Sequence, residues 1–439
     1  MEEKEVAKKI FLAGVEAALP GKLIESNVTK NGNLLTICGW KLDLTPFKQI
    51  YVIGAGKASA LMAAKLEDIL GDSISAGTVI VKYGHGAVCK HIQVIEAGHP
   101  YPDQNGVDGT REIMELVKNA GQDDLVICLF SGGGSSLLAD FPQGSKLDEL
   151  IRLNQLFIPS GATIQEMNSV RKHLSGIKGG QLASMAWPAQ LVSLVLSDVV
   201  GDPLDVIASG PTVPDPTTFE DAMNVIRKYH LTEKIPGRLL KRLIEGTEGK
   251  IPETPKEGDK SFGNVENHII GSNRIALQNC RKKAVELGFE TFLLKANMTG
   301  NTLVVAQETV RKAVKVLRQL KRRKKVCLLL GGETTLTVNG PGLGGRNQHF
   351  ALVAAKALRG TEGITLLAGG TDGNDGPTDA AGALVDGSTW DNAIDQLLQP
   401  EAYLQNFDSY HFFKKAGNHL ITGPTMTNVM DLVVVLIKG

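Results

Sequence analysis

The sequence predicts an α/β protein of two domains, the larger one built on a doubly wound, mainly parallel sheet. A chain of 439 residues is too long for one ordinary hydrophobic core. In its first half, apolar runs typical of buried strands alternate with helical periodicity, as in a parallel sheet that is covered on both faces. The polar segment Lys250–Lys260, with two prolines and no periodicity, suits a surface loop or a linker, and its position favours the linker. We therefore place the domains at residues 1–255 and 263–439.

Apolar periodicity predicts the individual elements. A helix is expected over residues 2–18 and another after the glycine-rich turn at 54–59. The remaining predicted helices cover residues 106–119, 274–287 and 302–320 and start again near 347. The predicted strands cover residues 33–40, 49–53, 78–82, 92–96, 125–130, 191–196, 268–271, 290–295, 326–330, 334–338, 364–368 and 431–437.

The composition favours a cytoplasmic protein and gives no sign of a nucleic-acid or membrane partner. Lysine plus arginine (47) equals aspartate plus glutamate (47), so no net field attracts nucleic acid or acidic membranes. The five cysteines are widely spaced, which favours reduced core thiols. The N-terminus has no apolar signal segment, and no apolar run approaches the roughly 20 residues of a membrane helix.

Five apolar runs end in glycine together with serine, aspartate, glutamate or lysine. Ligands of open parallel sheets bind at the carboxyl ends of the strands. One such loop is ordinary turn chemistry, whereas five indicate a site that is assembled from both halves of the chain. The five strand ends cover residues 53–57, 130–135, 196–202, 330–333 and 368–377.

The first of these turns, Gly54–Ser59, presents a lysine to a helix N-terminus. It lacks the third glycine of a dinucleotide fingerprint and is too short for a P-loop. As a plain turn with an exposed lysine it needs no function, but Lys57 is well placed to meet a phosphate.

The second turn, Ser131–Ser136, resembles a nucleophile elbow only in part. Leu137 stands where the second glycine of G-x-S-x-G is required, so we interpret the turn as an anion cradle and disfavour a hydrolase. The residues predicted to bind substrate or phosphate in the two turns are Gly54, Gly56, Ser131, Gly132, Gly133, Gly134, Ser135 and Ser136.

Aspartates crowd the loop after residue 368. Asp372 and Asp375 match an EF-hand only loosely, which disfavours calcium, whereas carboxylates beside phosphates more often hold Mg²⁺. A capped turn is the alternative, since Asp and Gly are ordinary turn residues.

An arginine follows the glycine-rich stretch 340–345. Arg346 on a mobile loop suits a transition-state clamp, with a plain surface arginine as the alternative. Glu333 is a candidate for metal or ribose contacts, and Asp198, at a strand end, for accepting a proton from a substrate hydroxyl.

Nine ordered motifs, from about residue 5 to the end, resemble the class II glycerate kinases, the glycerate 2-kinase family whose C-terminal part is called the MOFRL domain. The resemblance implies a larger Rossmann-like domain, a smaller α/β MOFRL domain and an active site in the cleft between them. It also implies phosphorylation of D-glycerate at its 2-hydroxyl with ATP and Mg²⁺, with Lys57 and Arg346 as active-site residues. The motifs cover residues 54–59, 98–103, 130–136, 168–175, 196–202, 208–212, 331–335, 344–347 and 371–379.

Two other functions stay open at this stage. Family members have also been labelled hydroxypyruvate reductases, so an NAD(P)H-dependent reductase is the alternative, although the broken glycine fingerprint weighs against it. A non-catalytic sensor of sugar acids or nucleotides is the third hypothesis. The sequence does not determine the oligomeric state and is compatible with a homodimer.

Overall fold

The computed structural model describes residues 3–439 and divides the chain into two compact units. The N-terminal unit is Leu23–Ile270, and the C-terminal unit joins the residues up to Lys22 to Gly271–Gly439. This division differs from the predicted boundaries at both ends. Helix α1 (Glu3–Ala17) packs on α11 (Asn273–Glu286) and on the sheet of the C-terminal unit, where Phe11 lies against Gly369, so the first helix belongs to that unit. Residue 2, the first of the predicted helix, lies outside the described residues.

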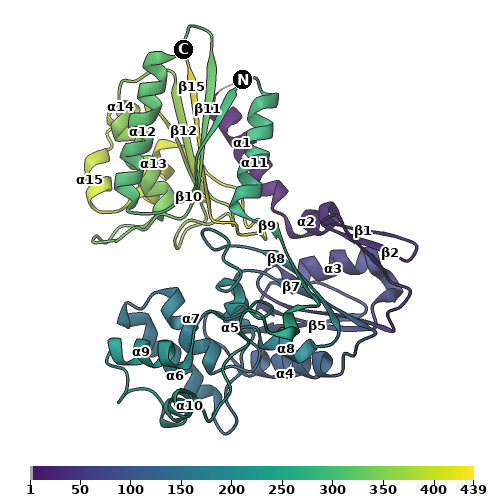
Figure 1. The fold of residues 1–439 in the computed structure, drawn as a ribbon. Coiled ribbons are helices and arrows are strands. Elements are labelled where there is room, and N and C mark those ends of the chain that lie inside the picture. Colours follow the sequence, from purple (N-terminus) through teal and green to yellow (C-terminus); the bar gives the residue numbers. More distant parts are fainter. Residues whose placement is uncertain (1–2) are drawn as a thin grey trace. The chain divides into compact units, whose positions relative to one another are not determined.

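A six-stranded sheet forms the centre of the N-terminal unit (Figure 1). The strand order is β6-β5-β4-β7-β8-β9, and the β4–β5, β4–β7, β5–β6 and β7–β8 pairings are parallel, as predicted. Every residue of β7 is buried, which explains its continuous apolar run. The strands are β4 (Gln49–Ala55), β5 (Ala76–Lys82), β6 (Ile92–Ala97), β7 (Asp124–Phe130), β8 (Gln190–Leu196) and β9 (Val265–Gly271).

The predicted strand 33–40 is instead the hairpin of β2 (Leu34–Ile37) and β3 (Trp40–Asp43). Cys38 and Gly39 have φ values of 50° and 84°, as in the two-residue turns that join antiparallel strands. With β1 (Val28–Asn31), the hairpin makes a separate three-stranded sheet.

Helices flank the N-terminal sheet, and four of them form a second layer with its own core. Leu153, Phe157, Val170 and Phe219 belong to this core. None of these four helices is among the elements predicted from the sequence, although α9 and α10 are amphipathic. Beside the sheet lie α3 (Ser59–Leu70), α4 (Gln104–Lys118), α5 (Gly134–Leu137) and α8 (Gln181–Ala186), and the second layer is α6 (Leu147–Phe157), α7 (Ile164–His173), α9 (Phe219–Lys228) and α10 (Gly237–Thr247).

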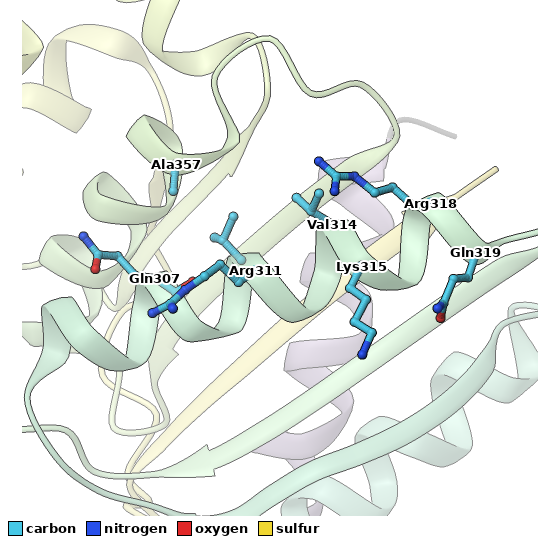
Figure 2. A pocket seen from close by; sticks show the side chains of 8 residues that line it. Gln307, Arg311, Val314, Lys315, Arg318, Gln319 and Ala357 are labelled. Carbon is cyan, nitrogen blue, oxygen red and sulfur yellow. The ribbon is translucent and has the colours of Figure 1, made fainter.

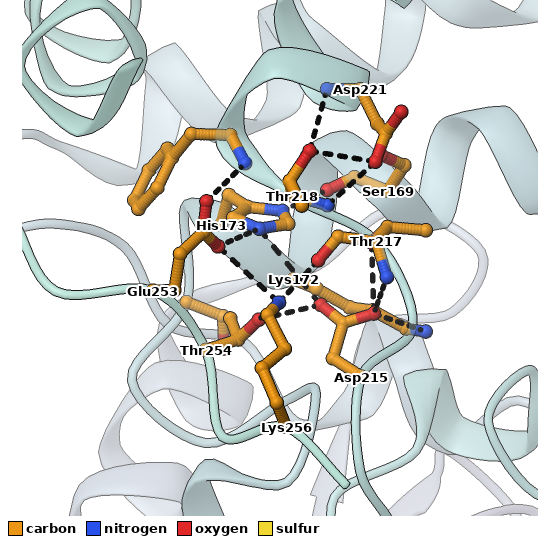
Figure 3. A network of polar contacts seen from close by, with 12 residues as sticks. Ser169, Lys172, His173, Asp215, Thr217, Thr218, Asp221, Glu253, Thr254 and Lys256 are labelled. Atoms are coloured by element: carbon orange, nitrogen blue, oxygen red, sulfur yellow. Dashed lines mark hydrogen bonds and ion pairs between the residues drawn. The ribbon is translucent and has the colours of Figure 1, made fainter. Parts of the chain in front are cut away.

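The segment Lys250–Lys260 is not a linker, because buried polar contacts tie it to the N-terminal unit (Figure 3). Glu253 contacts His173 Nε2 at 3.0 Å, and the Thr254 hydroxyl donates to Asp215 at 2.9 Å. Asp215 is 1% exposed and pairs at 3.1 Å with Lys172, which is 2% exposed. Most of the segment is exposed, so it is a surface loop of the N-terminal unit, which Glu253 and the buried Thr254 anchor.

The C-terminal unit has a mixed six-stranded sheet in the order β10-β11-β15-β12-β13-β14. β15 lies antiparallel between β11 and β12, and β10 pairs parallel with β11. The strands are β10 (Glu290–Met298), β11 (Lys325–Gly332), β12 (Ile364–Gly370), β13 (Gly382–Asp386), β14 (His419–Leu420) and β15 (Asp431–Lys438), and the longer helices besides α1 and α11 are α12 (Thr302–Gln319) and α13 (Arg346–Leu358).

The strand predicted at residues 334–338 is absent from the described structure. Thr335 makes only a single parallel bridge to Asn301, and the Thr334 hydroxyl accepts a hydrogen bond from Thr302. These contacts anchor the start of α12 instead of extending the sheet. Among residues 3–439, no helix combines the length and the apolarity needed to cross a membrane.

The buried ion pair of Lys172 and Asp215 predicts a large stability effect. Asp215→Ala leaves Lys172 with Asp205, 3.7 Å away, as its remaining acidic partner. We expect the free energy of unfolding to fall by about 3–5 kcal/mol, since the variant leaves a buried charge poorly compensated. Urea denaturation measures this. The control Asp123→Ala removes an exposed pair with Lys48 and is expected to cost less than about 1 kcal/mol.

Candidate functional site

In the N-terminal unit, the ends of β4, β7 and β8 approach one another too closely for side chains at the glycine positions. A Cβ on Gly54 would overlap the Leu129 carbonyl oxygen, and one on Gly56 would overlap Ser131. A Cβ on Gly132 would overlap the carboxylate of Asp198. The glycines predicted to bind an anion are therefore also required by packing.

Lys57 lies where these strand ends meet. Its backbone N–H donates to the carbonyl of Gly132 at 2.9 Å, and its carbonyl contacts His85 Nδ1 at 3.0 Å. The Lys57 side chain is close enough to Asp198 and His99 to shift the pKa of both. We name Lys57, His99, Ser131–Ser136 and Asp198 the strand-end cluster.

The serines of this cluster differ in what they bind. Ser131 is 1% exposed, and its hydroxyl accepts the backbone N–H of Ala58 at 3.0 Å. Ser135 contacts the Ser209 hydroxyl at 2.6 Å, and Ser136 donates to the Gly133 carbonyl at 3.1 Å. Ser131 thus holds the turn together, whereas Ser135 and Ser136 line a pocket.

Two titratable groups of the strand-end cluster have shifted pKa values. Burial raises the pKa of Asp198, although the positive charge of Lys57 opposes this. Burial lowers the pKa of His99 to about 4, with Lys57 as the next cause, so the imidazole is neutral at pH 7. A carboxylate with a raised pKa beside a lysine suits a general base, which is the role predicted for Asp198.

In the C-terminal unit, Arg346 is the centre of a second group, which we name the arginine cluster. Its Nε and Nη2 atoms donate to Asp431 at 2.6 and 3.0 Å, and Nη1 donates to Glu333 at 2.6 Å. Asp431 is fully buried, and Asn347 Nδ2 also donates to it at 2.8 Å. Arg346 is thus the first residue of α13, held by a bidentate ion pair and not carried on a free loop.

Asp375, the fifth member of the arginine cluster, binds the start of α13. Its carboxylate accepts the backbone N–H groups of Asn347 and Gln348 at 3.0 and 2.8 Å, where the helix dipole favours negative charge. Burial nevertheless raises its pKa to about 6. Both oxygens are engaged, so the structure favours the capped turn over a metal ligand for Asp375.

Asp372 is the remaining predicted metal ligand. Its carboxylate lies near enough to raise the pKa of Asp431, and its Oδ1 accepts the N–H of Asn374 at 3.1 Å. Across residues 3–439, no three His, Cys, Asp or Glu side chains converge as a metal cage. Mg²⁺ usually takes one or two carboxylates and completes its shell with substrate phosphates and water. Asp372 fits that smaller role, which stays a prediction.

The two clusters contain most of the predicted site residues and three that were not predicted from the sequence: His99, Asn347 and Asp431. His99 belongs to a quoted motif, but nothing in its spacing connects it to Lys57. Asp431 begins an otherwise apolar strand. A charged residue at the start of a buried strand is unusual, and this could have identified Asp431 from the sequence.

One pocket lies apart from both clusters. It follows α12 and has a volume of about 580 Å³ (Figure 2). Its lining includes Arg311, Lys315 and Arg318 and none of the predicted site residues. The strand-end pocket, which Ser135 and Ser136 line, adjoins the predicted site residues.

Two family models match the chain. Residues 6–244 match a domain of unknown function, DUF4147, and residues 326–431 match the MOFRL family. The D-glycerate 2-kinase of Thermotoga maritima is 41% identical over 99% of this chain and 98% of that protein. The glycerate 2-kinase of Pyrococcus horikoshii is 38% identical over 100% of this chain and 98% of its own length. A protein of Agrobacterium vitis with the provisional name hydroxypyruvate reductase is 38% identical, over 99% of this chain and 94% of that protein.

Solved structures agree with these matches. The crystal structure of a glycerate kinase from Thermotoga maritima has a TM-score of 0.88 at 39% identity and covers 99% of each chain. The crystal structure of the PH0495 protein from Pyrococcus horikoshii OT3 has a TM-score of 0.89 at 38% identity, covering 100% of this chain and 99% of that one. The two family matches and the full-length relatives lead to one conclusion: the chain belongs to the glycerate 2-kinase family, with an N-terminal DUF4147 domain and a C-terminal MOFRL domain.

Proposed function

We propose that this protein phosphorylates D-glycerate at its 2-hydroxyl, with ATP as the phosphate donor. The observation that carries the proposal is the 41% identity to a D-glycerate 2-kinase over almost the whole of both chains. The chemistry of the two clusters supports it, because each offers a cation beside carboxylates. Phosphoryl transfer depends mainly on alignment and positive charge around the moving group.

In the proposed reaction, the 2-hydroxyl oxygen of glycerate attacks the γ-phosphorus of ATP. The new oxygen–phosphorus bond forms while the bond to the β–γ bridging oxygen breaks, which releases ADP. Asp198 accepts the hydroxyl proton, and its raised pKa suits that role. Lys57 stabilises charge on the phosphoryl oxygens, and Arg346 is the second active-site cation that the family resemblance implies. Mg²⁺ bound with the nucleotide would neutralise phosphate charge, with Asp372 as the candidate ligand.

A phosphate-donor assay with D-glycerate and ATP tests the function directly. We expect ATP-dependent product, which ³¹P NMR identifies as 2-phosphoglycerate; 3-phosphoglycerate would overturn the proposed position. Two relatives carry a provisional reductase name, so the same preparation is mixed with hydroxypyruvate and NADH or NADPH. Rapid loss of nicotinamide absorbance without kinase turnover would favour the reductase instead.

Lys57→Ala is expected to lower kcat by about 10²–10³-fold, the usual cost of losing one preorganised charge at a transition state. The circular dichroism spectrum should not change, because only the side chain beyond Cβ is removed. Lys65→Ala, a half-exposed lysine of α3 outside both clusters, is the matched control and should keep wild-type kinetics. Wild-type turnover by Lys57→Ala would exclude the proposed role of the lysine.

Arg346→Ala is expected to lower both turnover and stability. The substitution leaves the buried Asp431 without its cation, which costs about 3–5 kcal/mol of unfolding free energy. Steady-state kinetics and urea denaturation measure the two effects separately. Arg318→Ala, in the surface pocket of α12, is the control and should affect neither. A stable, fully active Arg346→Ala enzyme would contradict both roles.

His99→Asn is expected to reduce the loss of folding stability that occurs as the pH falls below about 6.5. The folded pKa of His99, about 4, lies below its ordinary value of about 6.5. Its contribution to stability is therefore complete above pH 6.5 and is lost as the pH falls toward 4. Thermal unfolding at pH 7.5 and pH 4.5 measures the difference, with His411→Asn as an exposed control. Equal losses in wild type and His99→Asn would contradict the burial of a neutral ring.

A further inference from the structure

The N-terminal unit contains a pocket of about 240 Å³ beside the strand-end cluster. Ser135 and Ser136 line one side of it, and α6 and α7 supply most of the rest. Its walls are largely apolar, with Leu153 and Phe157 among them, and Ile158 and Ile164 on the lining are 65% and 42% exposed. An apolar pocket with a few polar groups is typical of a site for a small organic ligand.

Arg171 brings a positive charge to this pocket without an acidic partner. Its Nε and Nη2 atoms both donate to the amide oxygen of Asn154, at 3.1 and 2.8 Å. Among residues 3–439, no carboxylate lies within ion-pair distance of its guanidinium, and burial lowers its pKa with no neighbouring charge to oppose the effect. Asn154 orients the guanidinium without neutralising it.

Other cations of low exposure have carboxylates near them. Arg242 is half-buried and its Nε donates to the His173 carbonyl; burial lowers its pKa, but Asp140 and Glu245 oppose this. Two further cations are paired directly. Lys178, which lines the same pocket, pairs with Asp140 at 3.1 Å, and Arg346 pairs with two carboxylates. Burying a charge is unfavourable unless an opposite charge accompanies it. The uncompensated guanidinium of Arg171 is therefore explained most simply by an anion that binds in the pocket.

The size and position of the pocket indicate which anion. A volume of about 240 Å³ lies below the range typical of drug-sized ligands, which excludes a nucleoside triphosphate but suits a three-carbon acid. The planar guanidinium matches the geometry of a carboxylate. The pocket also adjoins the reaction site, because Ser136 on its lining bonds to Gly133, where an added Cβ would lie 2.9 Å from His99 and 3.6 Å from Lys57 Cγ.

We propose that Arg171 binds the carboxylate of the hydroxy-acid substrate, with Asn154 orienting the guanidinium and Ser135 and Ser136 offering hydroxyls to the same ligand. This inference rests on the proposed kinase function, and it identifies the part of the substrate that the N-terminal unit recognises. It makes the negative charge of the acid, and not only its hydroxyl, a requirement for binding.

Two variants of the full chain test the inference. Arg171→Met removes the charge and keeps most of the side-chain volume, whereas Asn154→Asp keeps the arginine and neutralises it with a neighbouring carboxylate. Both are expected to raise the KM for D-glycerate about 10- to 100-fold, the range for one charge-assisted hydrogen bond. The KM for ATP should stay within twofold of wild type. Arg171→Lys should recover part of the loss.

Calorimetric titration with D-glycerate alone gives a second readout that needs no turnover, and affinity should fall by the same factor. Arg152→Met, an exposed arginine on α6, is the matched control and should bind as wild type does. If Arg171→Met does not fold, Asn154→Asp still decides, because it adds an ion pair and removes no packing. Unchanged glycerate affinity in Asn154→Asp, or an equal rise in the KM for ATP, overturns the inference. A wild-type protein that does not phosphorylate glycerate at all overturns the proposed function instead.

Discussion

The close approach of three neighbouring strand ends is the constraint on which the N-terminal site depends. Gly54, Gly56 and Gly132 stand where a single Cβ would overlap the backbone or a side chain of the adjacent strand end. The same approach brings Lys57 beside Asp198. The glycines of these turns therefore allow Lys57 to lie close to Asp198. Their suitability for binding an anion is a consequence of the same close packing.

The partner of each buried or half-buried cation distinguishes cations that stabilise the fold from cations that are available to bind a ligand. Lys172 pairs with a buried aspartate, and Arg346 is held by a bidentate ion pair, so both stabilise the fold whatever else they do. Arg171 has only a neutral amide as its partner. A half-buried charge without a counter-ion is unfavourable, so the position of Arg171 beside an open pocket favours a bound anion there.

The helical layer also supports a strained turn beside the site. Ala208 and Ser209 have φ values of 50° and 61°, a region that costs residues with a side chain about 1–3 kcal/mol each. The Ser209 hydroxyl donates to Asn168 of α7 at 3.1 Å, and Lys172 of the same helix reaches Asp205. Helix α7 therefore holds the turn that contacts Ser135, which connects the second core to the site.

The sequence by itself determined the strand-and-helix alternation, the parallel N-terminal sheet, the glycine-rich strand ends and the family, because hydrophobic periodicity and turn residues are local signals. It predicted Lys57 and Arg346 but not their partners His99 and Asp431. Only the tertiary structure decided that Lys250–Lys260 is a surface loop anchored to the N-terminal unit and not a linker, and that the first helix belongs to the C-terminal unit. Only it could decide that Arg171 lacks a counter-charge. Burial and ion pairing join residues far apart in the chain, and no local pattern encodes those distances.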